Sequence, residues 1–142
     1  MLDHGSAILA FSSLALLSTP EIKPAPMSKN YREITQSVSA SLAKLRTDIP
    51  DVTNGFSALA RAATKDGALD GKTKELIALA LGVAAHCDAC IGFHVQALIR
   101  LGVQRIELEE ALGMAVYMGG GPSLMYAADA LAAYEEFSLA AV

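Results

Sequence analysis

The residues best suited to chemistry lie close together, in the stretch His86–His94. The chain has two cysteines, Cys87 and Cys90, separated by two residues. At 3.6 residues per helical turn, Cys90 and His94 lie one turn apart and about 40° apart around the axis. Cys87 nearly eclipses His94 if the helix reaches back that far. Both thiols and the imidazole are therefore predicted to share one helix face.

This arrangement suits a thiol that acts as a nucleophile. A predicted break before Cys87 puts both cysteines near a helix N-terminus, where partial positive charge stabilises a thiolate. His94 can accept the thiol proton, and Glu75, the one acid in an apolar helix, can fix the imidazole tautomer. We expect Cys90 to attack, because it lies nearest His94 on the helix, and Cys87 to resolve the sulfenic acid into a disulfide. Asp88 opposes thiolate formation.

Other interpretations of these residues are open. The two cysteines can be buried structural thiols without reactivity. They can also bind zinc together with His86 and His94, which gives enough ligands for tetrahedral coordination, although structural zinc sites usually draw a second ligand pair from a distant segment. Glu75 can pair with Lys72 or Lys74 on a solvated turn instead of with a histidine.

Helical periodicity runs through the chain from residue 31 onward, and no alternating pattern typical of a strand appears. The helix beginning near residue 72 is apolar on nearly all sides beyond Glu75, which predicts that it is buried. Three glycines followed by Pro122 predict a corner between two helices, and the Lys-Ser/Thr of a phosphate loop is absent. We expect an all-α fold, a single-domain bundle of about six helices, over residues 31–49, around 56–60, 72–85, 88–100, 103–118 and 122–137.

Residues 1–26 are predicted to form an N-terminal extension, and residues 27–142 the helical domain. The extension holds an apolar run, Ala7–Leu17, followed by a Pro-rich link. The run is shorter than the roughly 20 residues of a membrane span. No Lys or Arg precedes it and no clear cleavage site follows, so it is not typical of an export signal. An extra helix packed on a neighbour, or a start at Met27, explains it better.

The composition limits the function classes. The net charge is −4, no Lys or Arg block stands out, and Trp is absent, so we expect no nucleic-acid partner and no membrane partner. The chain is 53% hydrophobic and 18% charged, against roughly 45–50% and 25% in average soluble domains. This excess favours a homo-oligomer over a monomer with an unusually dry core. Two neighbouring thiols predict a reducing compartment, the cytoplasm.

With Glu75, Cys87, Cys90 and His94 at these spacings, the chain resembles the alkylhydroperoxidase D family, within the carboxymuconolactone decarboxylase superfamily. A lone CxxC is weak evidence, whereas the four residues together with both flanks are specific. The resemblance covers roughly residues 56–137, with Lys72-Thr73-Lys74-Glu75-Leu76-Ile77 before the motif and Tyr117-Met118-Gly119-Gly120-Gly121-Pro122 after it. It implies an all-helical bundle that assembles into trimers or hexamers, often with active sites near subunit contacts.

The resemblance also implies reduction of a small hydroperoxide, with Cys90 attacking, Cys87 resolving, and His94 and Glu75 forming a proton relay. Reducing equivalents would come from a dithiol or a lipoylated protein, and we expect no cofactor or metal. Alkylhydroperoxidase D itself has a histidine directly before the second cysteine, where this chain has Ala89. Decarboxylases of the superfamily lack the CxxC, which counts against that activity.

Three functions of different classes follow. The favoured one is an enzyme, a thiol-dependent peroxidase or disulfide reductase. The second is a non-catalytic, redox-sensing oligomeric scaffold whose disulfide alters assembly. The third is a metal-binding module that uses the cysteines and histidines. Turnover with a reductant separates the first from the second, and stoichiometric zinc would support the third.

Overall fold

A computed structural model describes residues 29–139 of the chain, so the predicted extension over residues 1–26 lies outside it. This part of the chain is helical and contains no strand, which confirms the all-α prediction. None of its helices is both long and apolar enough to cross a membrane. The helices are α1 (Tyr31–Asp48), α2 (Pro50–Thr64), α3 (Gly71–Ala84), α4 (Asp88–Arg100) and α5 (Arg105–Ser138).

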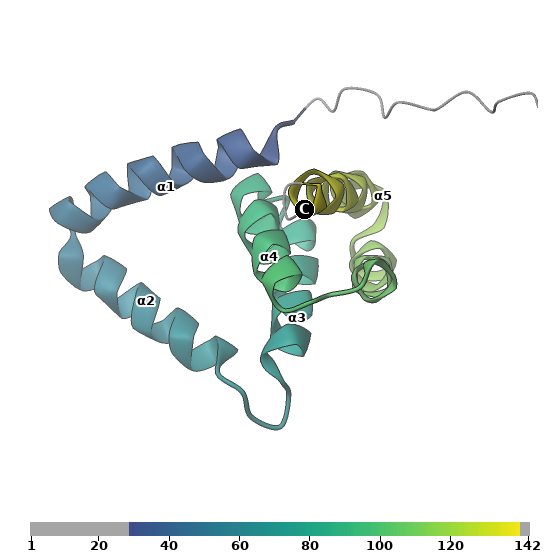
Figure 1. The fold of residues 1–142 in the computed structure, drawn as a ribbon, viewed down its shortest axis with the longest axis horizontal. Helices are drawn as coiled ribbons and strands as arrows, with labels where there is room; N and C mark the ends of the chain where they lie inside the picture. Colours follow the sequence, from purple (N-terminus) through teal and green to yellow (C-terminus); the bar gives the residue numbers. More distant parts are fainter. Residues whose placement is uncertain (1–28, 140–142) are drawn as a thin grey trace, which may run out of the picture.

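Helices α3, α4 and α5 pack together and form the core (Figure 1). The beginning of α1 lies against α4 and α5, and the rest of α1 runs outward before α2 returns toward the start of α3 (Figure 1). The core side chains come mainly from α1, α3, α4 and α5, and the largest apolar ones that are fully buried are Tyr31, Leu79, Val83, Ile91, Val95, Leu98 and Leu108.

Local capping residues set the helix starts near the site. The Asp70 side chain accepts a hydrogen bond from the backbone N–H of Thr73, and α3 therefore begins at Gly71. The Asn30 side chain does the same for α1 by accepting from the N–H of Glu33. Both boundaries lie within one residue of the predicted positions.

Residues 29–139 contain five helices where the sequence predicted six, because the two helices predicted over residues 103–118 and 122–137 are joined in α5. Helix α5 bends at Gly120, whose φ of 67° and ψ of −153° are not helical. Pro122 follows in the first turn after the bend, where a missing backbone N–H costs nothing. The predicted corner at the three glycines is thus present, but it bends one element instead of separating two.

The prediction that α3 is buried on nearly all sides is wrong for this chain by itself. Leu79 and Val83 are buried, but Ile77 and Leu81 on another face are exposed. Within residues 29–139, α3 packs mainly on α4 and α5. Helix α2 is even more exposed than α3, since none of its 15 residues is buried. Part of the excess apolar composition is therefore on the surface.

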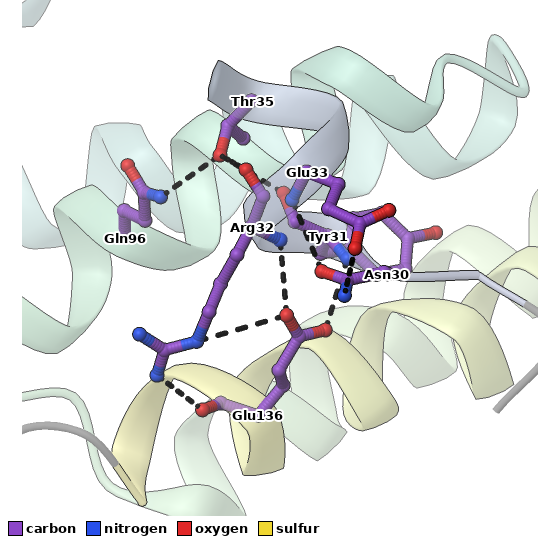
Figure 2. A network of polar contacts seen from close by, with 7 residues as sticks. All are labelled: Asn30, Tyr31, Arg32, Glu33, Thr35, Gln96 and Glu136. Carbon is purple, nitrogen blue, oxygen red and sulfur yellow. Dashed lines mark hydrogen bonds and ion pairs between the residues drawn. The ribbon is translucent and has the colours of Figure 1, made fainter. Parts of the chain in front are cut away.

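A polar network holds the start of α1 on the core (Figure 2). The Glu136 carboxylate of α5 accepts hydrogen bonds from the backbone N–H groups of Tyr31 and Arg32, both at 2.9 Å, where the helix dipole favours an anion. Arg32 in turn donates to the Glu136 carbonyl at 2.8 Å. Gln96 of α4 donates to the Thr35 hydroxyl at 3.3 Å. These contacts fix the backbone next to residue 29.

Candidate functional site

The break predicted before Cys87 is confirmed, and its geometry is specific. The Cys87 N–H donates to the Gly82 carbonyl at 3.0 Å, and the His86 N–H donates to the Val83 carbonyl at 3.1 Å. This is the Schellman pattern that ends a helix. His86 occupies its left-handed position, with a φ of 54°, where glycine is usual. The chain thus turns sharply from α3 into α4 just ahead of the first cysteine.

Both cysteines lie at the N-terminus of α4. Cys87 is the N-cap residue, and its sulfur accepts a hydrogen bond from the Cys90 N–H at 3.3 Å. The two residues form a disulfide, with their α-carbons 5.3 Å apart. Helix α3 approaches closely here, since a Cβ added at Gly82 would lie 3.3 Å from the Cβ of Cys90. Because Cys87 and Cys90 form a disulfide at the start of α4, they are close enough for reversible disulfide chemistry at the positive end of a helix.

Glu75 of α3 lies opposite His94 of α4, with Oε2 2.7 Å from Nδ1. The exposed fraction is 13% for the Glu75 side chain and 31% for that of His94. A carboxylate that accepts from Nδ1–H leaves Nε2 without a proton and ready to accept one. The alternative pairing of Glu75 with a lysine is wrong: Lys72 binds Glu107 at 2.7 Å, and Lys74 donates to the carbonyl of residue 65.

The chain therefore contains the four predicted site residues as two contacting pairs, the disulfide and the Glu75–His94 pair. Three of the residues come from one turn and helix, α4, as their spacing in the sequence requires. Glu75 joins them because α3 packs on α4. The catalytic roles of these residues stay predictions.

Sequence reasoning missed the groups that surround Asp88. Lys29 donates to Asp88 Oδ1 at 2.8 Å and to Asp129 Oδ2 at 2.7 Å. The Tyr31 hydroxyl also donates to Asp88, at 3.4 Å. No local pattern could have revealed this cluster, because Lys29 is 59 residues from Asp88 in sequence and comes next to it only through the packing of α1.

The pKa values of two groups in this cluster are raised. Partial burial lowers the pKa of Lys29, but hydrogen bonds to Asp129 and Asp88 outweigh it, and the pKa rises above its ordinary value. Burial raises the pKa of Tyr31, and the charges of the same two carboxylates add to this effect. Lys29 is therefore a cation and Tyr31 a neutral donor at neutral pH.

An aromatic contact adjoins this cluster. The His86 ring stacks on Tyr126 with centroids 4.6 Å apart, and the Lys29 ammonium lies 4.5 Å from the centre of the same Tyr126 ring. Tyr126 thus links the turn before Cys87 to Lys29, which lies two residues before the start of α1. A cation over an aromatic face is attracted by the ring quadrupole.

A metal centre is not supported by the positions of the side chains. Within residues 29–139, no group of three or more His, Cys, Asp or Glu side chains lies close enough to hold a metal ion. The proposed zinc ligands are divided among different contacts: the cysteines bind each other, His94 binds Glu75 and His86 stacks on Tyr126.

Residues 50–133 match the model of the carboxymuconolactone decarboxylase family. The chain belongs to this family. Among curated relatives, an uncharacterized protein of Cupriavidus necator is 43% identical over 86 residues, which cover 61% of this chain and 76% of the relative. Another, uncharacterized protein 4 in the cox locus of Paracoccus denitrificans, is 35% identical over 98 residues, covering 69% of this chain and 88% of the relative.

Solved structures of family members have the same fold. The apo form of a carboxymuconolactone decarboxylase family protein from Legionella pneumophila is 64% identical, with a TM-score of 0.75 over 76% of this chain and 96% of that one. A Thermotoga maritima protein of this family is 29% identical, with a TM-score of 0.63 over 70% of this chain and 88% of that one. These similarities support the AhpD-like identification that the motif predicted.

Proposed function

We propose that this family member is a thiol-dependent peroxidase that reduces hydroperoxides through the Cys87–Cys90 pair. One observation carries the proposal: a disulfide at the N-terminus of α4 is followed one turn later by a histidine that already contacts a carboxylate. A reactive thiolate needs a positive environment and a base, and this arrangement supplies both.

The first half of the reaction oxidises the enzyme. In the reduced protein, His94 Nε2 accepts the thiol proton of Cys90. The thiolate attacks the terminal oxygen of the hydroperoxide, the O–O bond breaks, and the alkoxide takes up the proton to leave as an alcohol. Cys90 is then a sulfenic acid. The Cys87 thiol attacks its sulfur, the S–O bond breaks, water leaves, and the disulfide forms.

The second half restores both thiols. A dithiol reductant attacks the disulfide by thiol–disulfide exchange, and its own two sulfurs become a disulfide. We propose a small dithiol or a lipoylated protein as this reductant and the cytoplasm as the working compartment. The Thermotoga maritima relative has been described in connection with an antioxidative response, and peroxide reduction is consistent with such a role.

We further propose that the working form is a homo-oligomer, a trimer or hexamer. Val52, Phe56 and Leu59 of α2 share one helix face, and their exposed fractions are 67%, 71% and 65%. Ile77 and Leu81 of α3 add a second exposed apolar face. Apolar surfaces of this kind are usually covered by another subunit. Sedimentation of the native chain should give a mass of three or six protomers, and Phe56→Glu should lower it.

The test of the enzymatic proposal follows the thiols through one cycle. The reduced protein is mixed with one equivalent of peroxide, and free thiols and the peptide that contains both cysteines are analysed by mass spectrometry. We expect loss of both thiols as an intramolecular disulfide, restored by a dithiol, and multiple turnovers when the dithiol is in excess.

Two variants assign the roles of the cysteines. Cys90→Ser should abolish peroxide reduction, whereas Cys87→Ser should still form a sulfenic acid on Cys90 that a dimedone probe traps. Multiple turnover by Cys90→Ser would refute the assignment. A disulfide that forms once in the native protein but supports no turnover with any dithiol would instead favour a redox-sensing scaffold.

A further inference from the structure

Asp88, the first residue of α4, carries a negative charge that disfavours a thiolate on the neighbouring cysteines. Asp88 directly follows Cys87 and shares the first helical turn with Cys90. A carboxylate near a sulfur raises the free energy of the thiolate, because two negative charges repel. If Asp88 were free, it would weaken the stabilisation that the helix N-terminus gives to the thiolate.

Lys29 offsets this charge. Its ammonium lies 2.8 Å from Asp88 and 2.7 Å from Asp129 of α5, and Tyr31 donates a further hydrogen bond to Asp88. Two carboxylates and one ammonium give the cluster a net charge of −1. The same cluster without the ammonium would carry −2. The Lys29 and Asp88 side chains are 29% and 36% exposed, so solvent only partly screens their interaction.

We propose that Lys29 is a positioning residue that holds and neutralises the Asp88 carboxylate, and thereby keeps the thiolate and the reduced state of the cysteine pair accessible. This inference rests on the proposed redox role of the cysteines and names the electrostatic control of that site. Lys29 acts through Asp88, since its ammonium contacts the two carboxylates and the Tyr126 ring.

The other ionisable groups near the pair come from each surrounding element. Helix α3 provides Glu75, which contacts His94 of α4. The turn before α4 provides His86, which stacks on Tyr126 of α5. The salt bridges of Lys29 go to Asp88 and Asp129, whereas Glu75 pairs with His94. A change of charge at residue 29 or 129 therefore alters the cluster while leaving the Glu75–His94 pair in place.

The expected effects have opposite signs in two variants. Lys29→Met makes the cluster more negative, so it should raise the pKa of the attacking thiol and reduce its ionisation constant at least threefold. Asp129→Asn makes the cluster less negative, so it should lower the same pKa. A difference of this size is typical of one charge at several ångströms in a partly solvated site. Lys29→Arg should stay close to the native protein.

Two measurements that need no peroxide report these shifts. The first is the pH profile of iodoacetamide alkylation of Cys90 in the reduced protein. The second is the equilibrium in which the protein disulfide and two glutathione molecules give the protein dithiol and one glutathione disulfide. Above the thiol pKa, Lys29→Met should shift this equilibrium toward the protein disulfide at least threefold. Lys44→Met, which removes an exposed lysine of α1, is the matched control and should change neither readout.

The directions of the thiol pKa shifts in Lys29→Met and Asp129→Asn decide between the proposal and a purely structural role for Lys29. A structural role for Lys29 predicts that Lys29→Met and Asp129→Asn shift the thiol in the same direction, because both break the same ion pair, and that result would overturn the proposal. Unchanged alkylation profiles in both variants would also overturn it. Failure of peroxide turnover in the native protein would refute the proposed activity, but it would leave these two readouts measurable and the electrostatic inference separately decided.

Discussion

The Glu75–His94 contact gives the sharpest test of the proposed relay. Glu75→Gln keeps the size and shape of the side chain but removes its negative charge. In the native protein, Oε2 of Glu75 lies 2.7 Å from Nδ1 of His94, and a carboxylate there favours the tautomer with its proton on Nδ1 and an acceptor at Nε2. The glutamine amide can instead donate to Nδ1, which stabilises the tautomer that has lost this acceptor.

The size of the expected loss in kcat/KM follows from the hydrogen bond between Glu75 and His94 that the variant loses. A hydrogen bond to a charged group contributes about 1.5–3 kcal/mol, and each 1.4 kcal/mol corresponds to about a tenfold change in rate. The Glu75 side chain is only 13% exposed, so water cannot readily replace the carboxylate. We therefore expect Glu75→Gln to lower kcat/KM for hydroperoxide about 10- to 100-fold at neutral pH.

The assay is peroxide consumption with excess dithiol, followed from pH 6 to pH 9. The defect of Glu75→Gln should shrink toward pH 9, because a thiol ionises without a base once the pH rises above its pKa. Glu110→Gln, at an exposed position of α5, is the control and should behave as the native protein. Helical circular dichroism and Tm exclude unfolding as the cause. A native rate for Glu75→Gln across this pH range would refute the relay.

Two further predictions concern stability. In urea unfolding, Gly92→Ala should destabilise the fold by about 1–3 kcal/mol by overpacking, because the added Cβ would lie 2.6 Å from Cγ2 of Thr35. Gly113→Ala is the contrasting variant, since a Cβ there would meet no atom within 4 Å. It should stabilise the fold by about 0.5–1 kcal/mol in the same assay. Hydrogen bonds from Thr73 hold the pKa of Asp70 below its ordinary value of 3.8. The ionised Asp70 carboxylate therefore contributes its full stabilisation above pH 3.8, and this stabilisation is lost as the pH falls through the lowered pKa of the folded protein. Asp70→Asn should therefore flatten the fall in Tm below pH 4, and an unchanged slope would contradict the assignment.

The sequence by itself determined the features that depend on neighbouring residues. Helical periodicity and the turn before Cys87 placed both cysteines at the start of α4 and His94 one turn beyond them. These features are local, since capping and register involve residues three or four positions apart. The bend at Gly120 was also predictable from its glycines and proline, although not that α5 would continue across it.

Only the tertiary structure decided which distant groups meet. The sequence predicted Glu75 as the partner of His94 but left a pairing with a nearby lysine open, and the packing of α3 on α4 decided for His94. Lys29 reaches Asp88 because Glu136 and the core hold the start of α1 in place. The exposed faces of α2 and α3 depend equally on which neighbours are present. Contacts between residues far apart in the chain depend on how whole helices pack, and no short stretch of sequence encodes that packing.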